Sequence, residues 1–277
     1  MPQLSNRTLL LALPFGTPNL VLKWDILRRN LKYMATAIPN VFVKIDVELY
    51  IYDADLPIPA DILDVSNQYP GIKLNVVRQK GIVGDFFRLF ITPERLVRDK
   101  YNYVAITLDD VEITTNIDFK RLLILKRFSG AHCLMPTLSA DSTNIVYRYM
   151  VHDPNATYSG RVVSIAEFFW FLFDTKSYID RYYPLLDEQN PFGWGIDLIG
   201  FEQTGLRVLQ VNSFIVKHHI QGESYAMVGR NAHADMLKYL TERSHTVESL
   251  WNKRMVMNII NMSHLSESEW DHIWNQV

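Results

Sequence analysis

Four short apolar runs alternate with helix-like segments over the first 113 residues of the chain. The runs cover residues 8–13, 41–51, 72–77 and 103–108. The segments between them have apolar residues at helical spacing, and Pro93 interrupts the last; they cover residues 18–36, 58–69 and 84–100. Strands that alternate with helices form βαβ units around a mainly parallel sheet. The sequence therefore predicts an α/β fold with helices flanking a mainly parallel central sheet.

The alternation weakens after residue 113. We expect a helix over 118–127, strands over 131–137 and 145–151, an aromatic-rich helical stretch over 161–183, a Gly-rich turn over 190–200 and a short strand over 206–211. From about residue 222 the chain is predicted to be helical, with an apolar stripe and a capping box at 266–269; the stripe comprises Leu237, Leu240, Val247, Trp251, Met255 and Ile259. These patterns predict one domain over 1–221, with halves of about 1–115 and 116–221. A helical extension, 222–277, is expected to pack on it.

Composition excludes several classes of protein. The chain has 277 residues, with 28 Lys plus Arg against 30 Asp plus Glu and a formal net charge of −2, so it lacks the basic character of a nucleic-acid binder. Its single cysteine, Cys133, excludes an intramolecular disulfide. No apolar run approaches the roughly 20 residues that span a bilayer. We therefore expect a soluble, cytoplasmic protein; the sequence gives no indication of its oligomeric state.

Three acids follow the fourth apolar run, in the stretch YVAITLDDVEI. They are Asp109, Asp110 and Glu112. Carboxylates are seldom fully buried without a partner, and ligands of open α/β sheets bind at the carboxyl ends of the strands. Carboxylates also suit Mn²⁺ or Mg²⁺ bound together with substrate phosphates. The cluster is interpreted either as a metal and phosphate site or as a solvated turn.

Two later segments carry further polar chemistry. GWGIDLIG places Trp194, Gly195 and Asp197 together, which suits a hydroxylated acceptor held against an aromatic wall beside a base, or a structural turn. IVKHH ends in His218 and His219, whose imidazoles are either divalent-metal ligands or surface groups.

A third segment, KGIVGDFFR, precedes the acidic strand. It contains Lys80, Asp85 and Arg88. Asp85 and Arg88 are three residues apart on a predicted helix face. They form a salt bridge with each other there, or they bind nucleotide and phosphate.

Taken in order, the segments ALPFG, GDFFR, LDDVEI and GWGID and a late histidine resemble a nucleotide-sugar-dependent glycosyltransferase of the GT-A fold. More narrowly, the chain is similar over about residues 8 to 220 to an uncharacterised glycosyltransferase family of plants and large algal viruses. The resemblance implies a Rossmann-like sheet, a divalent ion that bridges the donor diphosphate and an Asp-any-Asp motif, and an acceptor-binding half.

The resemblance also implies roles for individual residues. Asp110 takes the place of the last, metal-binding acid and Asp109 the middle position, while Leu108 replaces the first acid. Glu112 and either His218 or His219 are further metal ligands, Asp197 is the general base, and Trp194 and Gly195 contact the acceptor. The expected donor-binding residues are Pro14, Phe15, Gly16, Lys80, Asp85, Arg88 and Asp109.

The expected activity is transfer of a sugar, with inversion, from a nucleoside-diphosphate sugar to a hydroxyl of a glycan acceptor. UDP-sugars such as UDP-xylose or UDP-glucose are favoured over GDP-sugars. Two alternatives stay open at this point. They are a sugar-phosphate nucleotidyltransferase, although PFGTPN lacks a basic Gly-rich loop, and a non-catalytic nucleotide- or sugar-binding module, given Leu108 in the place of an acid.

Overall fold

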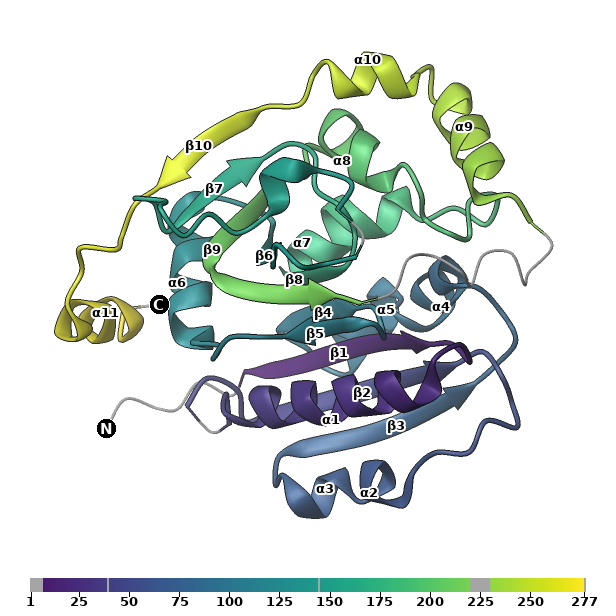
Figure 1. Cartoon of the computed structure of the whole chain (residues 1–277), viewed down its shortest axis with the longest axis horizontal. Coiled ribbons are helices and arrows are strands. Elements are labelled where there is room, and N and C mark those ends of the chain that lie inside the picture. The colour runs from purple at the N-terminus through teal and green to yellow at the C-terminus, as the bar shows by residue number, and fades with distance from the viewer. Residues whose placement is uncertain (1–6, 39, 144, 220–229, 277) are drawn as a thin grey trace.

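A mixed ten-stranded β-sheet forms the centre of the computed structural model, which describes residues 7–38, 40–143, 145–219 and 230–276 (Figure 1). The strands are β1 (Thr8–Phe15), β2 (Lys44–Ile51), β3 (Ile72–Arg78), β4 (Tyr103–Thr107), β5 (Val111–Ile113), β6 (Cys133–Leu138), β7 (Gly160–Val163), β8 (Trp170–Asp174), β9 (Val208–His218) and β10 (Val256–Ile260). Their order is β10-β7-β9-β6-β8-β4-β1-β2-β3, and β5 pairs with β9.

Helices lie on both faces of this sheet. The α-helices are α1 (Leu20–Ala35), α2 (Ala60–Leu63), α3 (Val65–Gln68), α4 (Val83–Phe90), α5 (Pro93–Arg98), α6 (Phe119–Ser129), α7 (Thr175–Ser177), α8 (Ile196–Thr204), α9 (Ala232–Glu242), α10 (Val247–Trp251) and α11 (Glu267–Trp274). Shorter helical turns are η1 (Arg148–Met150), η2 (Tyr178–Tyr182) and η3 (Tyr183–Leu185). This arrangement confirms the predicted α/β fold.

The first half of the chain is the parallel part of the sheet. β1 pairs in parallel with β2 and β4, and β2 pairs in parallel with β3. Their carboxyl ends therefore meet at one edge, as the four apolar runs predicted. α1 packs on the face that carries Leu11 and Leu13, while on the opposite face the ring of Tyr50 stacks on Phe86 of α4 with centroids 5.1 Å apart.

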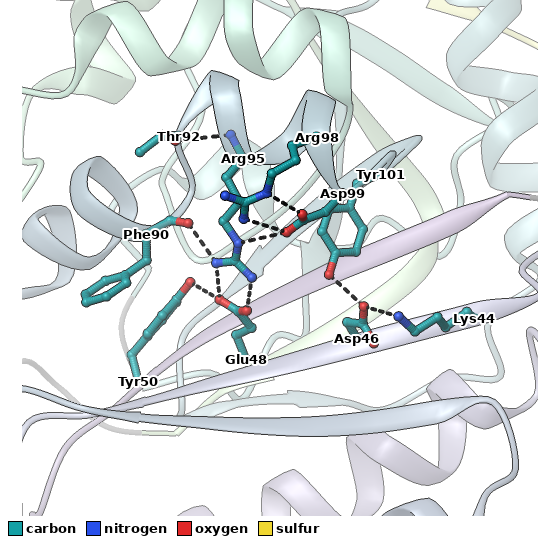
Figure 2. A network of polar contacts seen from close by, with 10 residues as sticks. All are labelled: Lys44, Asp46, Glu48, Tyr50, Phe90, Thr92, Arg95, Arg98, Asp99 and Tyr101. Carbon is teal, nitrogen blue, oxygen red and sulfur yellow. Dashed lines mark hydrogen bonds and ion pairs between the residues drawn. The ribbon is translucent and has the colours of Figure 1, made fainter.

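Buried charges tie α5 to this second face (Figure 2). Glu48 of β2 is 3% exposed. Its carboxylate accepts hydrogen bonds from Arg95 of α5, with Nη1–Oε2 at 2.8 Å, and from the Tyr50 hydroxyl at 2.5 Å. Two residues earlier on β2, Asp46 Oδ2 accepts a hydrogen bond from the Tyr101 hydroxyl at 2.6 Å. Because breaking a buried ion pair costs about 3–5 kcal/mol, this network fixes the helix on the sheet.

The second half of the chain extends the same sheet with mostly antiparallel pairings. β8 lies antiparallel to β4 and to β6. β9, of 11 residues, runs parallel to β6 and antiparallel to β7 and β5. The β4–β8 and β5–β9 pairings cross the predicted division at residues 115 and 116. The predicted end of the domain, at residues 221 and 222, lies outside the described residues.

Two predicted elements in this half are wrong. The aromatic stretch 161–183 is not one helix, because it contains most of β7, all of β8 and only short helical turns after Asp174. Trp170 to Phe173 are all buried, and a strand covered on both faces is apolar at every position, so periodicity does not separate it from a buried helix. The segment 145–151, predicted as a strand, forms η1, and only Val151 makes a β-bridge.

The C-terminal segment runs in an arc around the second half (Figure 1). Helices α9, α10 and α11 confirm its predicted helical character, and the capping box is present, with Ser266 N donating to Glu269 Oε2 at 2.7 Å. Residues 256–260 instead form β10, which pairs antiparallel with β7 at the edge of the sheet. The predicted apolar stripe is wrong at Leu237, Met255 and Ile259, whose side chains are exposed. No described helix has the length and apolar character needed to span a membrane.

Candidate functional site

The acids that follow β4 lie at the carboxyl edge of the parallel strands, and the first of them is held in place by β1 and α1. Asp109 Oδ2 accepts from the backbone N–H of Gly16 at 2.7 Å and lies 2.7 Å from Lys23 Nζ. Lys23 is only 4% exposed. Burial raises the pKa of Asp109 to about 6, although the charge of Lys23 opposes this rise. The position predicted to contact donor is thus an ion-paired carboxylate.

The short strand β5 carries Glu112 and directly follows Asp110, and two elements hold it. Asn30 of α1 donates to the Val111 carbonyl at 2.8 Å and accepts from Ile113 N at 2.9 Å. On its other side β5 pairs with the end of β9, where Val111 faces His218 and Glu112 faces Lys217. This pairing brings His218 and His219 close to the acids.

Asp110 and His218 form a buried carboxylate–imidazole pair. His218 Nε2 lies 3.1 Å from Asp110 Oδ2, and both residues are at most 9% exposed. Burial alone would lower the pKa of His218, but the hydrogen bond and charge of Asp110 raise it overall. The second ring nitrogen, Nδ1, is buried and has no hydrogen-bond partner.

This pair has the chemistry of a partial divalent-cation site. Carboxylate and imidazole both suit Mn²⁺, and a carboxylate suits Mg²⁺. Among the described residues no group of three or more His, Cys, Asp or Glu side chains could hold a metal ion. Asp110 and His218 fit a cation that takes its remaining ligands from water and from a substrate phosphate, which is the usual environment of Mg²⁺.

Glu112 and His219 form a separate pair. His219 Nε2 lies 2.6 Å from Glu112 Oε2, and Arg29 Nε lies 2.9 Å from Glu112 Oε1. Lys217 pairs with Asp141. Each predicted metal histidine therefore has its own acid, and the carboxylate of Glu112 is already neutralised by Arg29.

The predicted base, Asp197, lies in the first turn of α8. The Tyr147 hydroxyl donates to its Oδ2 at 2.5 Å. Burial raises the pKa of Asp197, while this hydrogen bond and nearby backbone N–H groups lower it. Tyr147 is itself 3% exposed, and its ring lies 5.1 Å from that of Trp251 in α10. The C-terminal segment thus helps to fix the hydroxyl that holds Asp197.

The loop before α8 has little room for any side chain at Gly195. Gly195 has φ +86°, and a Cβ there would meet Met236 Cγ of α9 at 3.0 Å. Glycine is the residue that adopts this backbone conformation without strain. Trp194 next to it is 36% exposed, so a broad aromatic surface lies close to Asp197 in the chain.

Of the residues expected to bind nucleotide, two lie on α4. Asp85 Oδ2 accepts from Ile82 N at 3.2 Å and caps the helix. Arg88 lies 3.7 Å from Asp85 and 3.8 Å from Glu188, so the salt bridge foreseen from their spacing is present. The neighbouring Gly84 donates its N–H to the Pro191 carbonyl at 2.7 Å, which joins α4 to the loop that carries Trp194.

The other expected donor residues have different surroundings. Pro14 and Phe15 end β1, and the Phe15 ring is fully buried and stacks on Trp24 at 4.0 Å, so it is a core residue. The backbone N–H of Gly16 donates to the Asp109 carboxylate, as described above. Lys80 is exposed beyond the end of β3, and no ion pair joins it to another described residue.

Three residues of the site were not predicted. Lys23 had a detectable signal, because a lysine occupies the apolar face of the predicted first helix. Glu167 was also detectable in the sequence, because it is the single acid in a long apolar stretch. No sequence signal pointed to Tyr147, because its partner Asp197 is 50 residues away in the chain.

Glu167 lies in the segment that enters β8. Burial raises the pKa of Glu167 to about 7. The charge of His218 opposes this rise, and the charges of Asp197 and Asp110 reinforce it. One of its carboxylate oxygens, Oε2, is buried and has no hydrogen-bond partner. The four side chains therefore form one electrostatic cluster.

Comparison with known proteins finds similarity in structure but not in sequence. No family model matches the chain, and no curated protein is significantly similar to it in sequence. Among solved structures, GalNAc-T7, determined with UDP, GalNAc and Mn²⁺, superposes with a TM-score of 0.55 at 12% identity. The match covers 84% of this chain and 47% of that one, so this chain spans about half the length of GalNAc-T7.

A second match, the mannose-1-phosphate geranyltransferase from Thermus thermophilus, has a TM-score of 0.39 at 11% identity and covers 76% of each chain; this is too weak to support an argument. The similarity to GalNAc-T7 concerns the fold alone, because the identity is low. The chain has a GT-A-like α/β fold, with its acidic strand end at the carboxyl edge of the parallel strands.

Proposed function

We propose that this protein is a divalent-metal-dependent glycosyltransferase. It moves a sugar from a nucleoside-diphosphate sugar, with UDP-sugars such as UDP-xylose or UDP-glucose favoured, to a hydroxyl of a glycan acceptor. The observation that carries the proposal is the Asp110–His218 pair, 3.1 Å apart at the end of the acidic strand, in a GT-A-like fold. The GT-A-like neighbour that was determined with UDP and Mn²⁺ adds support at the level of the fold.

The residues around the pair have distinct roles in this reaction. Asp110 and His218 would hold the cation, which when bound neutralises charge that builds on the departing diphosphate. Asp109 is held by Lys23 and Gly16, so its carboxylate is oriented in advance to meet the donor. Preorganised polar groups of this kind need no rearrangement during the reaction.

Proton transfer belongs to Asp197 in this proposal. The acceptor hydroxyl gives its proton to the Asp197 carboxylate while its oxygen attacks the anomeric carbon. The bond from that carbon to the diphosphate oxygen breaks on the opposite face, so the configuration inverts. Tyr147 orients the carboxylate through its 2.5 Å hydrogen bond, and burial keeps the pKa of Asp197 raised, which suits a base.

Calorimetric titration of UDP and of GDP, each with and without Mn²⁺, tests the donor site. We expect UDP to bind the wild type only with Mn²⁺, and Asp110→Ala to lose that binding. Asp271→Ala is the control, since Asp271 is exposed on α11 and away from the acidic edge. If neither nucleotide binds the wild type, the proposal fails, and a degenerate or unrelated α/β module becomes the better interpretation. Binding that is independent of metal and of Asp110 would also contradict it.

A further inference from the structure

Two buried polar atoms without partners occur in the same cluster. They are Nδ1 of His218 and Oε2 of Glu167. A buried polar group that makes no hydrogen bond is destabilising, so two of complementary kind in one cluster need an explanation. An imidazole nitrogen and a carboxylate oxygen can satisfy each other directly or through one water.

The strand pairing brings Glu167 to this position. β8 runs antiparallel to β4, with Trp170 facing Thr107, and Leu108 N donates to the Phe169 carbonyl at 3.0 Å. Because the two strands are antiparallel, moving forward from β4 toward the acids corresponds to moving back from β8 toward Glu167. Asp110 and Glu167 each lie three residues beyond the last pair of this ladder, at the same end of it.

Other contacts hold Glu167 beside the histidine. Its backbone N–H donates to the sulfur of Met150 at 3.4 Å. The backbone N–H of Val146 stabilises its carboxylate. The Phe169 ring lies 6.4 Å from the His218 ring. One end of the carboxylate is therefore held, while Oε2 remains open to a donor.

The tautomer of His218 completes the argument. When Nε2 binds a cation, the ring proton must be on Nδ1, and metal-bound histidines usually donate that proton to a carboxylate, a carbonyl or water. Glu167 is the carboxylate of the cluster that is not already paired, because Asp109 pairs with Lys23 and Asp197 with Tyr147. Asp110 contacts the other ring nitrogen.

We infer that Glu167 is a positioning residue for the candidate cation site. Its Oε2 accepts the Nδ1 proton of His218, directly or through one water, and so fixes the tautomer that presents Nε2 to the cation. The inference rests on the proposed function, because it assumes that Asp110 and His218 bind a divalent ion.

The test measures Mn²⁺ affinity in protein saturated with UDP, which does not depend on turnover. Glu167→Met removes the acceptor at similar volume and should weaken Mn²⁺ binding about 10- to 100-fold. Glu167→Gln keeps an amide oxygen as acceptor and should fall between the two. Glu242→Gln, an exposed residue of α9, should bind Mn²⁺ as the wild type does.

A second readout follows the histidine itself. With UDP and the diamagnetic Mg²⁺ bound, nitrogen NMR of His218 should detect an Nδ1 proton that is protected from solvent exchange in the wild type and exchanges faster in Glu167→Met. If Glu167→Met does not fold, Glu167→Gln alone decides, through its intermediate affinity.

The outcomes separate the two levels of the proposal. Failure of the UDP-saturated wild type to bind Mn²⁺ overturns the proposed function. Wild-type binding that both Glu167 variants retain in full overturns the positioning role alone. Loss of sugar transfer with unchanged Mn²⁺ affinity would likewise overturn it, because Glu167 would then act on the substrate.

Discussion

Asp197 differs from Asp109 and Glu112 in having a neutral partner. Its hydrogen bond comes from the Tyr147 hydroxyl, whereas Asp109 pairs with Lys23 and Glu112 with Arg29. A carboxylate that is oriented without being neutralised by a cation keeps its ability to accept a proton. This contrast is the reason to assign proton transfer to Asp197 rather than to Asp109 or Glu112.

Replacement of this carboxylate gives a direct prediction. Asp197→Asn should lower the turnover of sugar transfer by about 100- to 10,000-fold, the usual contribution of a general base, and leave Mn²⁺-dependent UDP binding unchanged. Tyr147→Phe should cause a smaller loss, because it removes the orienting hydroxyl but not the base. Steady-state kinetics together with calorimetry provide the measurement, and full turnover in Asp197→Asn would show that another group takes the proton.

At the scale of elements, the junction between β6 and β9 depends on an uncharged histidine. His132 Nδ1 accepts a hydrogen bond from Arg207 N at 3.1 Å. Burial lowers the pKa of His132 to about 4, from an ordinary value of 6.5. As pH falls through this window the unfolded chain binds a proton that the folded chain does not, so stability is lost.

Urea unfolding at several pH values tests this linkage. Between pH 6.5 and 4, the wild type should lose on the order of 1–2 kcal/mol more stability than His132→Asn, after allowance for solvent screening. Asparagine is the matched replacement, because its amide oxygen can accept from Arg207 N and does not titrate. Equal pH slopes in the two proteins would mean that His132 is not the group responsible.

The elements also differ in how far their sequences predict them. β1 to β4 were predictable, because each is a short apolar run bounded by polar turns. β8 was not, because a strand between two partners has no polar face to give alternation. β10 was misread because Met255 and Ile259 are spaced four apart and therefore fit a helix, although they lie on an exposed sheet edge.

At the scale of the whole molecule, the two halves share one sheet. β4 pairs with β8 and β5 with β9, so strands from either side of residue 115 exchange backbone hydrogen bonds. The side chains of the site come from both halves for the same reason. Asp110 and His218 could be matched through the order of motifs, whereas Lys23, Tyr147 and Glu167 act through contacts that no local pattern records.

Because strands of the two halves pair in one sheet, we expect one cooperative unfolding transition. Native-state hydrogen exchange in increasing urea should bring the central amides of β2 and of β9 to the same free energy of opening and the same denaturant dependence. Mass spectrometry of peptic fragments gives the measurement. Opening of β9 at clearly lower free energy than β2 would instead make the halves separate folding units.

The position of Cys133 has a practical consequence for such experiments. It is the one cysteine of the sequence, it is fully buried on β6, and burial raises the pKa of its thiol. An exposed thiolate is the nucleophile that reacts with thiol reagents, so the native protein should resist labelling. A cysteine introduced at an exposed position of α1 or α11 would then accept a fluorophore or spin label selectively, without removal of the natural residue.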